Sequence, residues 1–368
     1  MEFALPPELE KLRREAEEVA QRAAADLDVR EDSWINSHSR EFSRELGERG
    51  WLGMTWPSEY GGHERSALER FVVTEALIGN GAPIAATWFC DRQMGPSLLA
   101  FGTEEQKRRF VPDMAAGVAS WCIGMSEPDS GSDLASLRTR AVLEGDEFVV
   151  NGRKVWTSFA ALADWCYLIC RTDPDAPAHQ GLSELIVDMR SPGIVVSRIP
   201  DMTGNDHFCE VLFEDVRVPA TNLVGELNGA WRQTMSQLEY ERGGIDRLVS
   251  NRALYRDVLP RADTSDRRVR QAIADVETGY RLGRLLVLRE VLRQAPKGFS
   301  AATKTYCTSF EQRVADFCAR VAGPEAMLWN RIARGLCYAP AYTIQGGTNN
   351  ILRNIIGERV LGLPREPR

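Results

Sequence analysis

The chain has 368 residues, of which 43% are hydrophobic and 26% charged, the balance of a globular protein long enough for two or three domains. Its 45 basic and 52 acidic residues give a net charge of −7, without the basic stripe that nucleic-acid binders carry. No apolar run approaches the ~18 residues of a membrane span, and the N-terminus does not resemble a signal peptide. We therefore expect a cytoplasmic protein with neither nucleic-acid nor membrane partners. The eight cysteines and four histidines lack metal-ligand spacing, so we expect reduced thiols and no metal site.

Residues 1–120 are predicted to be helical. Apolar residues recur at steps of three and four from Leu9 to Ala23, the period of an amphipathic helix. A loop rich in glycine and proline interrupts this pattern at residues 56–62. A further helix is expected after Thr103, because threonine is a favoured N-cap residue and Gln106 stands in the capping-box position.

Residues 121–225 are predicted to form a compact antiparallel sheet domain. Strand-like runs separated by turn residues occupy 164–171, 184–189, 193–199 and 208–218. Asn151-Gly152 lies between two shorter runs. Because this dipeptide favours a type I′ turn, we expect a hairpin there.

Residues 226–368 return to the helical period, with Leu285, Leu288 and Leu292 on one apolar face. The predicted fold class is therefore α+β and mostly α. It has an N-terminal helical domain over 1–120, a middle antiparallel β-barrel-like domain over 121–225, and a C-terminal helical bundle over 226–368.

Two segments of the predicted sheet domain have the composition of a ligand site. The loop 124–133 concentrates serine, glycine and aspartate, so its backbone N–H groups and hydroxyls could bind a phosphate or a flat polar ligand. A polar surface turn would have the same composition. Residues 154–158 place Trp156 beside two hydroxyls at a strand end, where the indole could stack on a ring or simply fill the core.

Two further segments lie in the predicted bundle. Residues 238–244 end in two glycines within an expected helix, each costing about 1 kcal/mol relative to alanine. Glu239 and Glu241 are about 200° apart on that helix, so at most one could face a pocket, and both could equally be solvated. The paired glycines within 344–350 allow close approach of a ligand, or merely precede a helix capped by Thr348.

In this order, these segments resemble the acyl-CoA dehydrogenase family of flavoenzymes. The most specific part of the resemblance is Ser126-Glu127-Pro128 followed by Gly131-Ser132-Asp133. Further family-like segments are 51–62, 102–106, 213–226 and 353–362, so the resemblance covers nearly the whole chain.

The resemblance implies an FAD-dependent enzyme of fatty acid or steroid side-chain β-oxidation. In the family, a carboxylate removes the α-proton of an acyl thioester while the β-hydride passes to the flavin, and the product is the trans-2-enoyl thioester. A dry pocket raises the basicity of such a carboxylate. The implied partners are acyl-CoA or an acyl carrier protein as substrate, an electron-transfer flavoprotein, and other subunits of an oligomer.

The resemblance also assigns residues to the site. Those that match flavin-binding positions are Ile123, Met125, Ser126, Ser132, Trp156, Ser158, Thr348 and Asn350. Those that match substrate-binding positions are Ser132, Tyr240, Arg242 and Gly347.

The position of the base departs from the commonest family pattern. Many members carry it as the Glu of Tyr-Glu-Gly-Thr, which here reads Gln345-Gly346-Gly347-Thr348. A bacterial branch, with members that act on bulky or steroid side-chain acyl-CoAs, carries it instead in a Leu-x-x-Glu-Arg helix. Leu238-Glu239-Tyr240-Glu241-Arg242 matches that branch and implies that Glu241 is the base.

The motifs that reach a neighbouring subunit's flavin also depart from the family. Tyr255-Arg256 is not followed by Phe-Gly, and residues 317–323 lack a glutamine and one glycine of the Gln-x-x-Gly-Gly segment. Either a second, related chain supplies these groups, or basic residues such as Arg256 or Arg320 replace them. Two alternatives to the dehydrogenase stay open: a non-catalytic subunit of a heteromeric enzyme, and the same fold used for flavin oxidase or monooxygenase chemistry.

Overall fold

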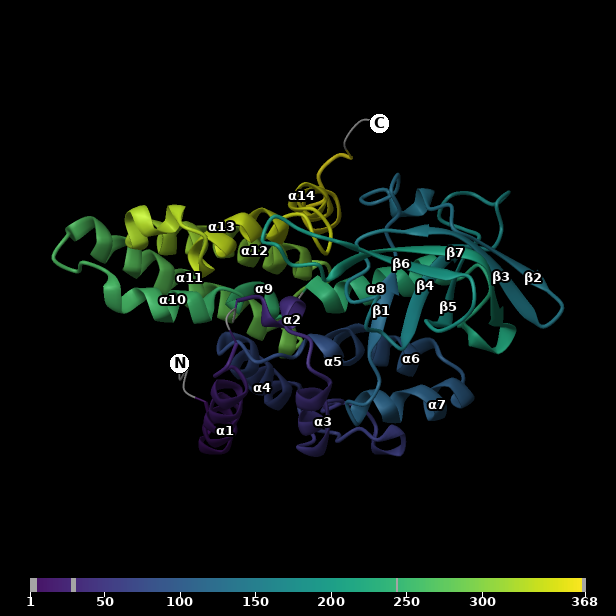
Figure 1. The fold of residues 1–368 in the computed structure, drawn as a ribbon, viewed down its shortest axis with the longest axis horizontal. Helices are drawn as coiled ribbons and strands as arrows, with labels where there is room; N and C mark the ends of the chain where they lie inside the picture. The colour runs from purple at the N-terminus through teal and green to yellow at the C-terminus, as the bar shows by residue number, and fades with distance from the viewer. Residues whose placement is uncertain (1–4, 28–30, 243, 366–368) are drawn as a thin grey trace. The chain divides into compact units, whose positions relative to one another are not determined.

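The computed structural model describes residues 5–27, 31–242 and 244–365, with the backbone alone for 239–242. Its chain forms two compact units. We call residues 39–64 and 85–238 the sheet unit, and residues 1–38, 65–84 and 239–368 the bundle unit. Helices and strands are labelled in Figure 1. The domain boundaries at 120 and 225 stay a prediction.

The sheet unit is built on one sheet in the order β6-β7-β3-β2-β4-β5-β8, with β1 added alongside β4. Most neighbours are antiparallel, but β1 pairs with β4 in parallel. Cysteine, valine, leucine and phenylalanine side chains fill the core between the strands. The strands are β1 (Trp121–Gly124), β2 (Arg140–Glu144), β3 (Glu147–Lys154), β4 (Trp165–Arg171), β5 (Leu182–Asp188), β6 (Ile194–Ile199), β7 (Phe208–Pro219) and β8 (Leu223–Val224).

The expected hairpin at Asn151-Gly152 is wrong. β3 runs straight through this dipeptide, and its register with β7 shifts between Val150 and Gly152, which marks a bulge. A Cβ on Gly152 would lie 2.6 Å from Thr139 Cα, so glycine is needed for close approach rather than for a turn. The turn itself lies earlier, between Glu144 and Glu147, the innermost pair of β2 and β3.

Helices complete the sheet unit. Thr103 and Gln106 form both bonds of the expected capping box at the start of α7. Between α5 and α6, residues Cys90–Met94 form one buried π-helical turn. The helices are α3 (Arg40–Glu48), α5 (Ala85–Phe89), α6 (Gly95–Phe101), α7 (Glu104–Ala115) and α8 (Ala230–Arg242), whose last four residues belong to the bundle unit.

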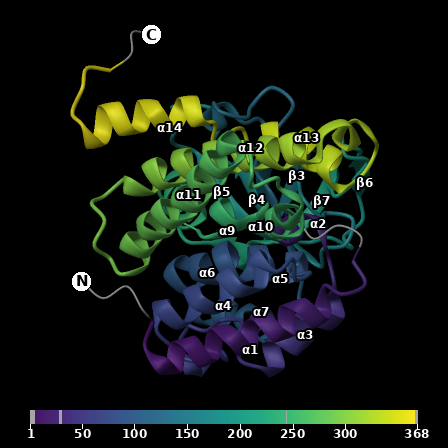
Figure 2. The ribbon, with the colours of Figure 1, turned by 90° about the vertical axis from the view of Figure 1, so that its left-hand side faces the viewer.

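Helices connected by loops make up the described part of the bundle unit, apart from an isolated β-bridge between His38 and Ile84. α12 packs against α10, α11, α13 and α14 (Figure 2). Leu288 is half-buried, whereas Leu285 and Leu292 are exposed, so the apolar face expected here is only partly covered by this chain. The helices are α1 (Pro7–Ala23), α2 (Ser33–Asn36), α4 (Ala67–Gly79), α9 (Asp246–Val249), α10 (Arg252–Val258), α11 (Arg267–Val291), α12 (Phe299–Ala322), α13 (Arg331–Tyr342) and α14 (Asn349–Ile355).

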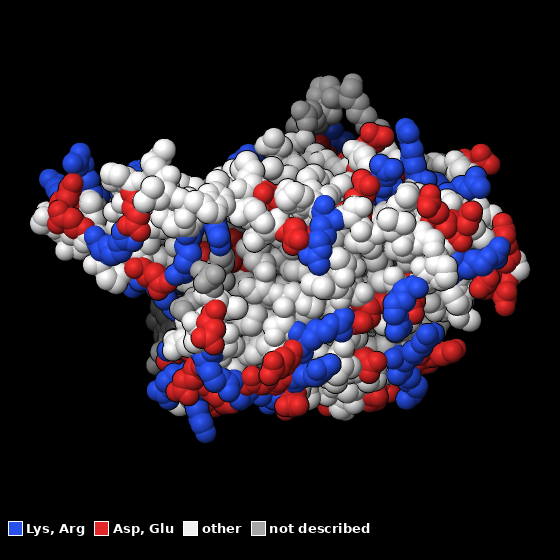
Figure 3. Space-filling model, in the orientation of Figure 1, with Lys and Arg blue, Asp and Glu red and all other residues white. Residues whose placement is uncertain are grey.

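The surface charges of both signs are interspersed on the face drawn in Figure 3. None of the helices in the described part of the chain is both long and apolar enough to cross a lipid bilayer.

Candidate functional site

A buried ion pair joins two of the predicted segments in the sheet unit. Lys154, at the end of β3, is fully buried and donates from Nζ to Glu127 Oε1 and to the Met125 carbonyl, both at 2.9 Å. Glu127 also accepts the backbone N–H groups of Arg138 and Thr139 at 2.6 and 2.8 Å. Burial raises the pKa of Glu127, but the Lys154 charge and these hydrogen bonds outweigh it and lower the pKa.

This pair places the predicted flavin-binding segments side by side. The Val155 N–H donates to the Ser126 carbonyl at 2.9 Å, directly beside the ion pair. Ile123, Met125 and Ser126 are half-buried at the exit of β1. Ser132 is exposed in the turn that follows.

Trp156 presents its ring to the outside of the sheet unit. Its side chain is 57% exposed and its φ is +61°, a left-handed conformation that is uncommon for a bulky residue. The indole meets Phe208 edge-on, with ring centroids 5.7 Å apart. The Thr157 N–H donates to the Cys209 carbonyl at 2.9 Å and fixes this strand end to β7. Trp156 therefore offers an exposed flat apolar ring, and the half-buried Ser158 follows it two residues along the chain.

The other predicted segment with described side chains lies in the bundle unit. Gly346 and Gly347 have φ of +67° and +89°, a region that glycine enters without strain. Thr348 caps α14 by accepting the Ile351 N–H at 3.3 Å, and Asn350 is exposed. Lys304 on α12 is fully buried and donates to the Gly347 carbonyl at 2.8 Å and to Asn349 Oδ1 at 3.0 Å.

The proposed base lies near the end of α8. Glu241, with Tyr240 and Arg242, is helical, but its side chain lies outside the described residues, as does Gly243. For Gly244 the expected mid-helix position is wrong, because this residue is not helical; for Gly243 the expectation lies outside the described residues. A Cβ on Gly244 would lie 2.0 Å from Asp246 Oδ1, so a larger residue here would require the Asp246 carboxylate to move.

The structure also shows functional candidates that sequence patterns missed. Lys154 could have been noticed, because it follows Phe148 and Val150 on the buried side of β3. Its partner Glu127 lies 27 residues away, beyond the reach of any local pattern. Lys304, inside the long helix α12, gave no comparable signal.

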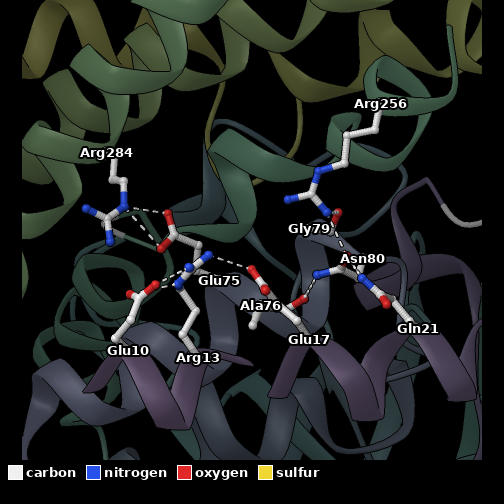
Figure 4. Close-up of polar contacts among 10 residues, drawn as sticks. All are labelled: Glu10, Arg13, Glu17, Gln21, Glu75, Ala76, Gly79, Asn80, Arg256 and Arg284. Carbon is white, nitrogen blue, oxygen red and sulfur yellow. Dashed lines mark hydrogen bonds and ion pairs between the residues drawn. The ribbon is translucent and has the colours of Figure 1, made fainter. Parts of the chain in front are cut away.

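Of the two arginines considered as replacements for the missing motifs, Arg256 is already engaged. It extends from α10 to the end of α4, where it donates to Asn80 Oδ1 at 2.6 Å and the Gly79 carbonyl at 3.4 Å (Figure 4). Arg320 is exposed on α12 and pairs with Asp316 one turn earlier.

Comparison with known proteins agrees with this architecture. Three family models match in chain order: the acyl-CoA dehydrogenase N-terminal domain over residues 6–118, the middle domain over 122–216 and the C-terminal domain over 228–361. The acyl-CoA dehydrogenase IpdE1 of Mycobacterium tuberculosis is 36% identical, over 89% of both chains.

Two solved structures are similar over the whole chain. The Tcur3481-Tcur3483 steroid ACAD has a TM-score of 0.90 at 33% identity, with 100% of both chains covered. The ChsE4-ChsE5 complex from Mycobacterium tuberculosis has a TM-score of 0.85 at 32% identity, again with 100% of both chains covered.

Proposed function

The chain belongs to the acyl-CoA dehydrogenase family, and from that premise we propose that it introduces the α,β double bond into a bulky acyl-CoA, with FAD as the cofactor and Glu241 as the base. The α-proton goes to the Glu241 carboxylate. The bound FAD supplies the acceptor for the β-hydrogen, which leaves with its electron pair, and the trans-2-enoyl thioester remains.

The residues of the sheet unit fit a flavin. A planar ring system needs an apolar surface with hydrogen-bonding groups at its edge, and Trp156 with Ser158 offers both. The Lys154–Glu127 pair holds the Met125–Ser126 segment against the same strand end. On this assignment, Ile123, Ser126 and Ser132 complete the flavin site of the sheet unit. In the bundle unit, Thr348 and Asn350 are the residues that we propose for dinucleotide binding.

The remaining residues act on the substrate. Glu241 takes the proton. This role requires exclusion of water, because desolvation raises the basicity of a carboxylate. Arg242 pairs with the phosphate-bearing end of the thioester, and Tyr240 and Ser132 contact it. Gly347 leaves room for the acyl chain.

The proposal rests on one observation above all. The segment before α14, where many relatives carry the base, holds two left-handed glycines and no carboxylate. α8 instead ends in Glu241-Arg242, and residue 346, as a glycine, brings no side chain of its own to the site. The presence of Glu241 supports a catalytic rather than a non-catalytic subunit.

The substrate and partner are proposed from the relatives. The name of one similar structure, the Tcur3481-Tcur3483 steroid ACAD, gives a steroid substrate class. Its name and that of the ChsE4-ChsE5 complex each give two different chains. This chain has Gly346 where many relatives carry the larger base, which favours a bulky substrate. It also lacks the motifs that reach a neighbouring subunit's flavin, which favours a related chain as partner. We therefore propose a steroid-type acyl-CoA as substrate, a related chain as partner and an electron-transfer flavoprotein as acceptor.

The test is Glu241→Gln, which keeps the shape of the side chain but removes the proton acceptor. We expect turnover with acyl-CoA to fall by at least ~10³ with the flavin still bound. Glu239→Gln, on the same helix, is the matched control and should keep turnover. Near-normal turnover in Glu241→Gln, or its loss in Glu239→Gln, would reject the assignment. Hydrogen peroxide formed in proportion to product would indicate oxidase chemistry instead.

A further inference from the structure

Glu184 lies at the centre of a polar network inside the sheet unit. It stands on β5, is fully buried, and pairs across the sheet with Ile169 of β4 and Val224 of β8. A carboxylate placed there without partners would be strongly destabilising. Its two oxygens are instead bonded to four side-chain donors.

Three of those four donors come from α8. Gln233 Nε2 donates to Oε2 of Glu184 at 2.7 Å, while Thr234 Oγ1 and Gln237 Nε2 donate to Oε1 at 2.9 and 3.0 Å. Residues 233, 234 and 237 share one face of a helix. The fourth donor is Tyr167 Oη of β4, at 2.8 Å from Oε2.

The network therefore joins three residues of α8 to one residue of the sheet, Glu184. Gln233 adds a second link by donating to the Val224 carbonyl at 3.1 Å. Burial raises the pKa of Glu184 to about 7, and the four donors oppose that rise. Gln237, the last α8 residue in the network, precedes Glu241 by one helical turn.

We propose that Glu184 is a positioning residue: through Thr234 and Gln237 it fixes the height and rotation of α8 against the sheet, and so the place of Glu241. This inference rests on the proposed role of Glu241. Displacement of a catalytic base by 1 Å can lower the reaction rate by about two orders of magnitude. A fixed position of α8 therefore affects the rate as well as the stability of the protein.

Three variants separate positioning from ordinary stabilisation. Gln237→Leu and Thr234→Val each remove one donor on α8, whereas Tyr167→Phe removes one donor on β4 from the same carboxylate. Each leaves Glu184 in place with one hydrogen bond fewer. A purely structural role predicts similar effects from all three.

The readouts are the rate constant of flavin reduction by acyl-CoA, KM, and amide hydrogen exchange in α8, measured on the FAD-loaded enzyme. For the two α8 variants we expect a reduction rate at least ~10-fold lower, little change in KM and faster exchange over residues 238–242. Tyr167→Phe should stay within ~2-fold of wild type in rate and keep the exchange of α8 slow.

Equal loss of rate in all three variants, or an unchanged rate in both α8 variants, would overturn the proposal. So would unchanged exchange in α8. Failure of the proposed function gives a different result. Glu241→Gln then keeps wild-type turnover, and Glu184 has no base to position, whatever the hydrogen exchange of α8 shows.

Discussion

At the scale of single residues, the Lys154–Glu127 pair makes the strongest prediction for stability. Lys154→Met leaves the Glu127 carboxylate buried and facing no cation. We expect unfolding free energy to fall by about 3–5 kcal/mol, as when one partner of a buried pair is removed. FAD affinity should fall as well, because Lys154 also holds the Met125 carbonyl. Denaturant unfolding and flavin titration measure the two effects.

The double variant Lys154→Met with Glu127→Gln is the matched control. It removes both charges, while the amide oxygen can still accept a backbone N–H. Stability should recover by at least ~1 kcal/mol relative to the single variant. A Lys154→Met protein as stable as wild type would show that the pair contributes little.

The individual site residues were predictable to very different degrees. Ser126, Trp156 and Thr348 stand in motifs that a reader of the sequence can identify. The partners that fix those motifs, Lys154 and Lys304, are lysines at positions where a local pattern predicts an apolar residue. Their roles depend on groups 27 and 43 residues away, and distances of that kind are set by tertiary packing.

At the scale of elements, the strands were predictable because apolar and polar residues alternate along them and turn residues mark their ends. The expected strand at 164–171 is observed as Trp165–Arg171 and that at 208–218 as Phe208–Pro219. The hairpin predicted at Asn151-Gly152 is absent because a glycine can serve either a turn or a bulge. Only the neighbouring Thr139 backbone decides between the two.

The cap of α14 supports a prediction that separates structure from cofactor binding. Thr348 accepts the Ile351 N–H and is proposed to contact the dinucleotide. Thr348→Ala should lower stability by ~1 kcal/mol and weaken FAD binding. Thr348→Asp keeps a cap of at least equal strength but sets a carboxylate beside the phosphates. It should preserve the melting temperature of the apoprotein and still lose FAD affinity.

Thermal melts of the apoprotein and flavin titration together test this prediction. Thr348→Ser, which keeps both the cap and the hydroxyl, is the control and should behave as wild type. Unchanged FAD affinity in Thr348→Asp would place the cofactor away from this helix end.

At the scale of the whole molecule, buried acids should make stability depend on pH. Burial raises the pKa of Asp32 from 3.8 to about 7, although Tyr342 Oη donates to it at 2.6 Å. Between about pH 4 and 7 the native chain then keeps a proton that the unfolded chain has lost. Unfolding free energy therefore decreases as pH rises, by at most ~1.4 kcal/mol per pH unit for this group.

Asp32→Asn should reduce this slope. An asparagine tolerates the φ of +53° at this position and can still accept the Tyr342 bond. Its stability relative to wild type should increase from pH 5 to pH 8, as measured by urea unfolding at each pH. Asp113→Asn, at an exposed carboxylate, should leave the slope unchanged. A parallel slope in Asp32→Asn would contradict the role of this acid.

The oligomeric assembly can be predicted from the absence, in this sequence, of the family motifs that reach a neighbouring subunit's flavin. Arg256 is used within the bundle unit (Figure 4), so it cannot also reach a neighbour's cofactor without breaking its bonds to Asn80 and Gly79. Leu282 and Leu285 of α11 and Leu292, the residue that follows this helix, are 49%, 41% and 47% exposed. They form an apolar strip that a further subunit would cover. A homo-oligomer would bury cofactor phosphates facing no matched donor, which is unfavourable.

We therefore expect the chain expressed alone to bind little FAD, so the flavin and rate measurements on its variants require the co-expressed complex. Co-expression with a related chain that carries the Arg-Phe-Gly and Gln-x-x-Gly-Gly motifs should give a tetramer with FAD in half of its sites. Native mass spectrometry measures both stoichiometries.

Arg256→Met should lower the melting temperature of the chain, because it breaks the contact between α10 and α4, whereas Arg320→Met, at an exposed position, should not. A homo-tetramer of this chain holding four FAD would show that its own residues complete the site. In that case, loss of FAD in Arg320→Met would identify the donor, since Arg256 is committed to Asn80.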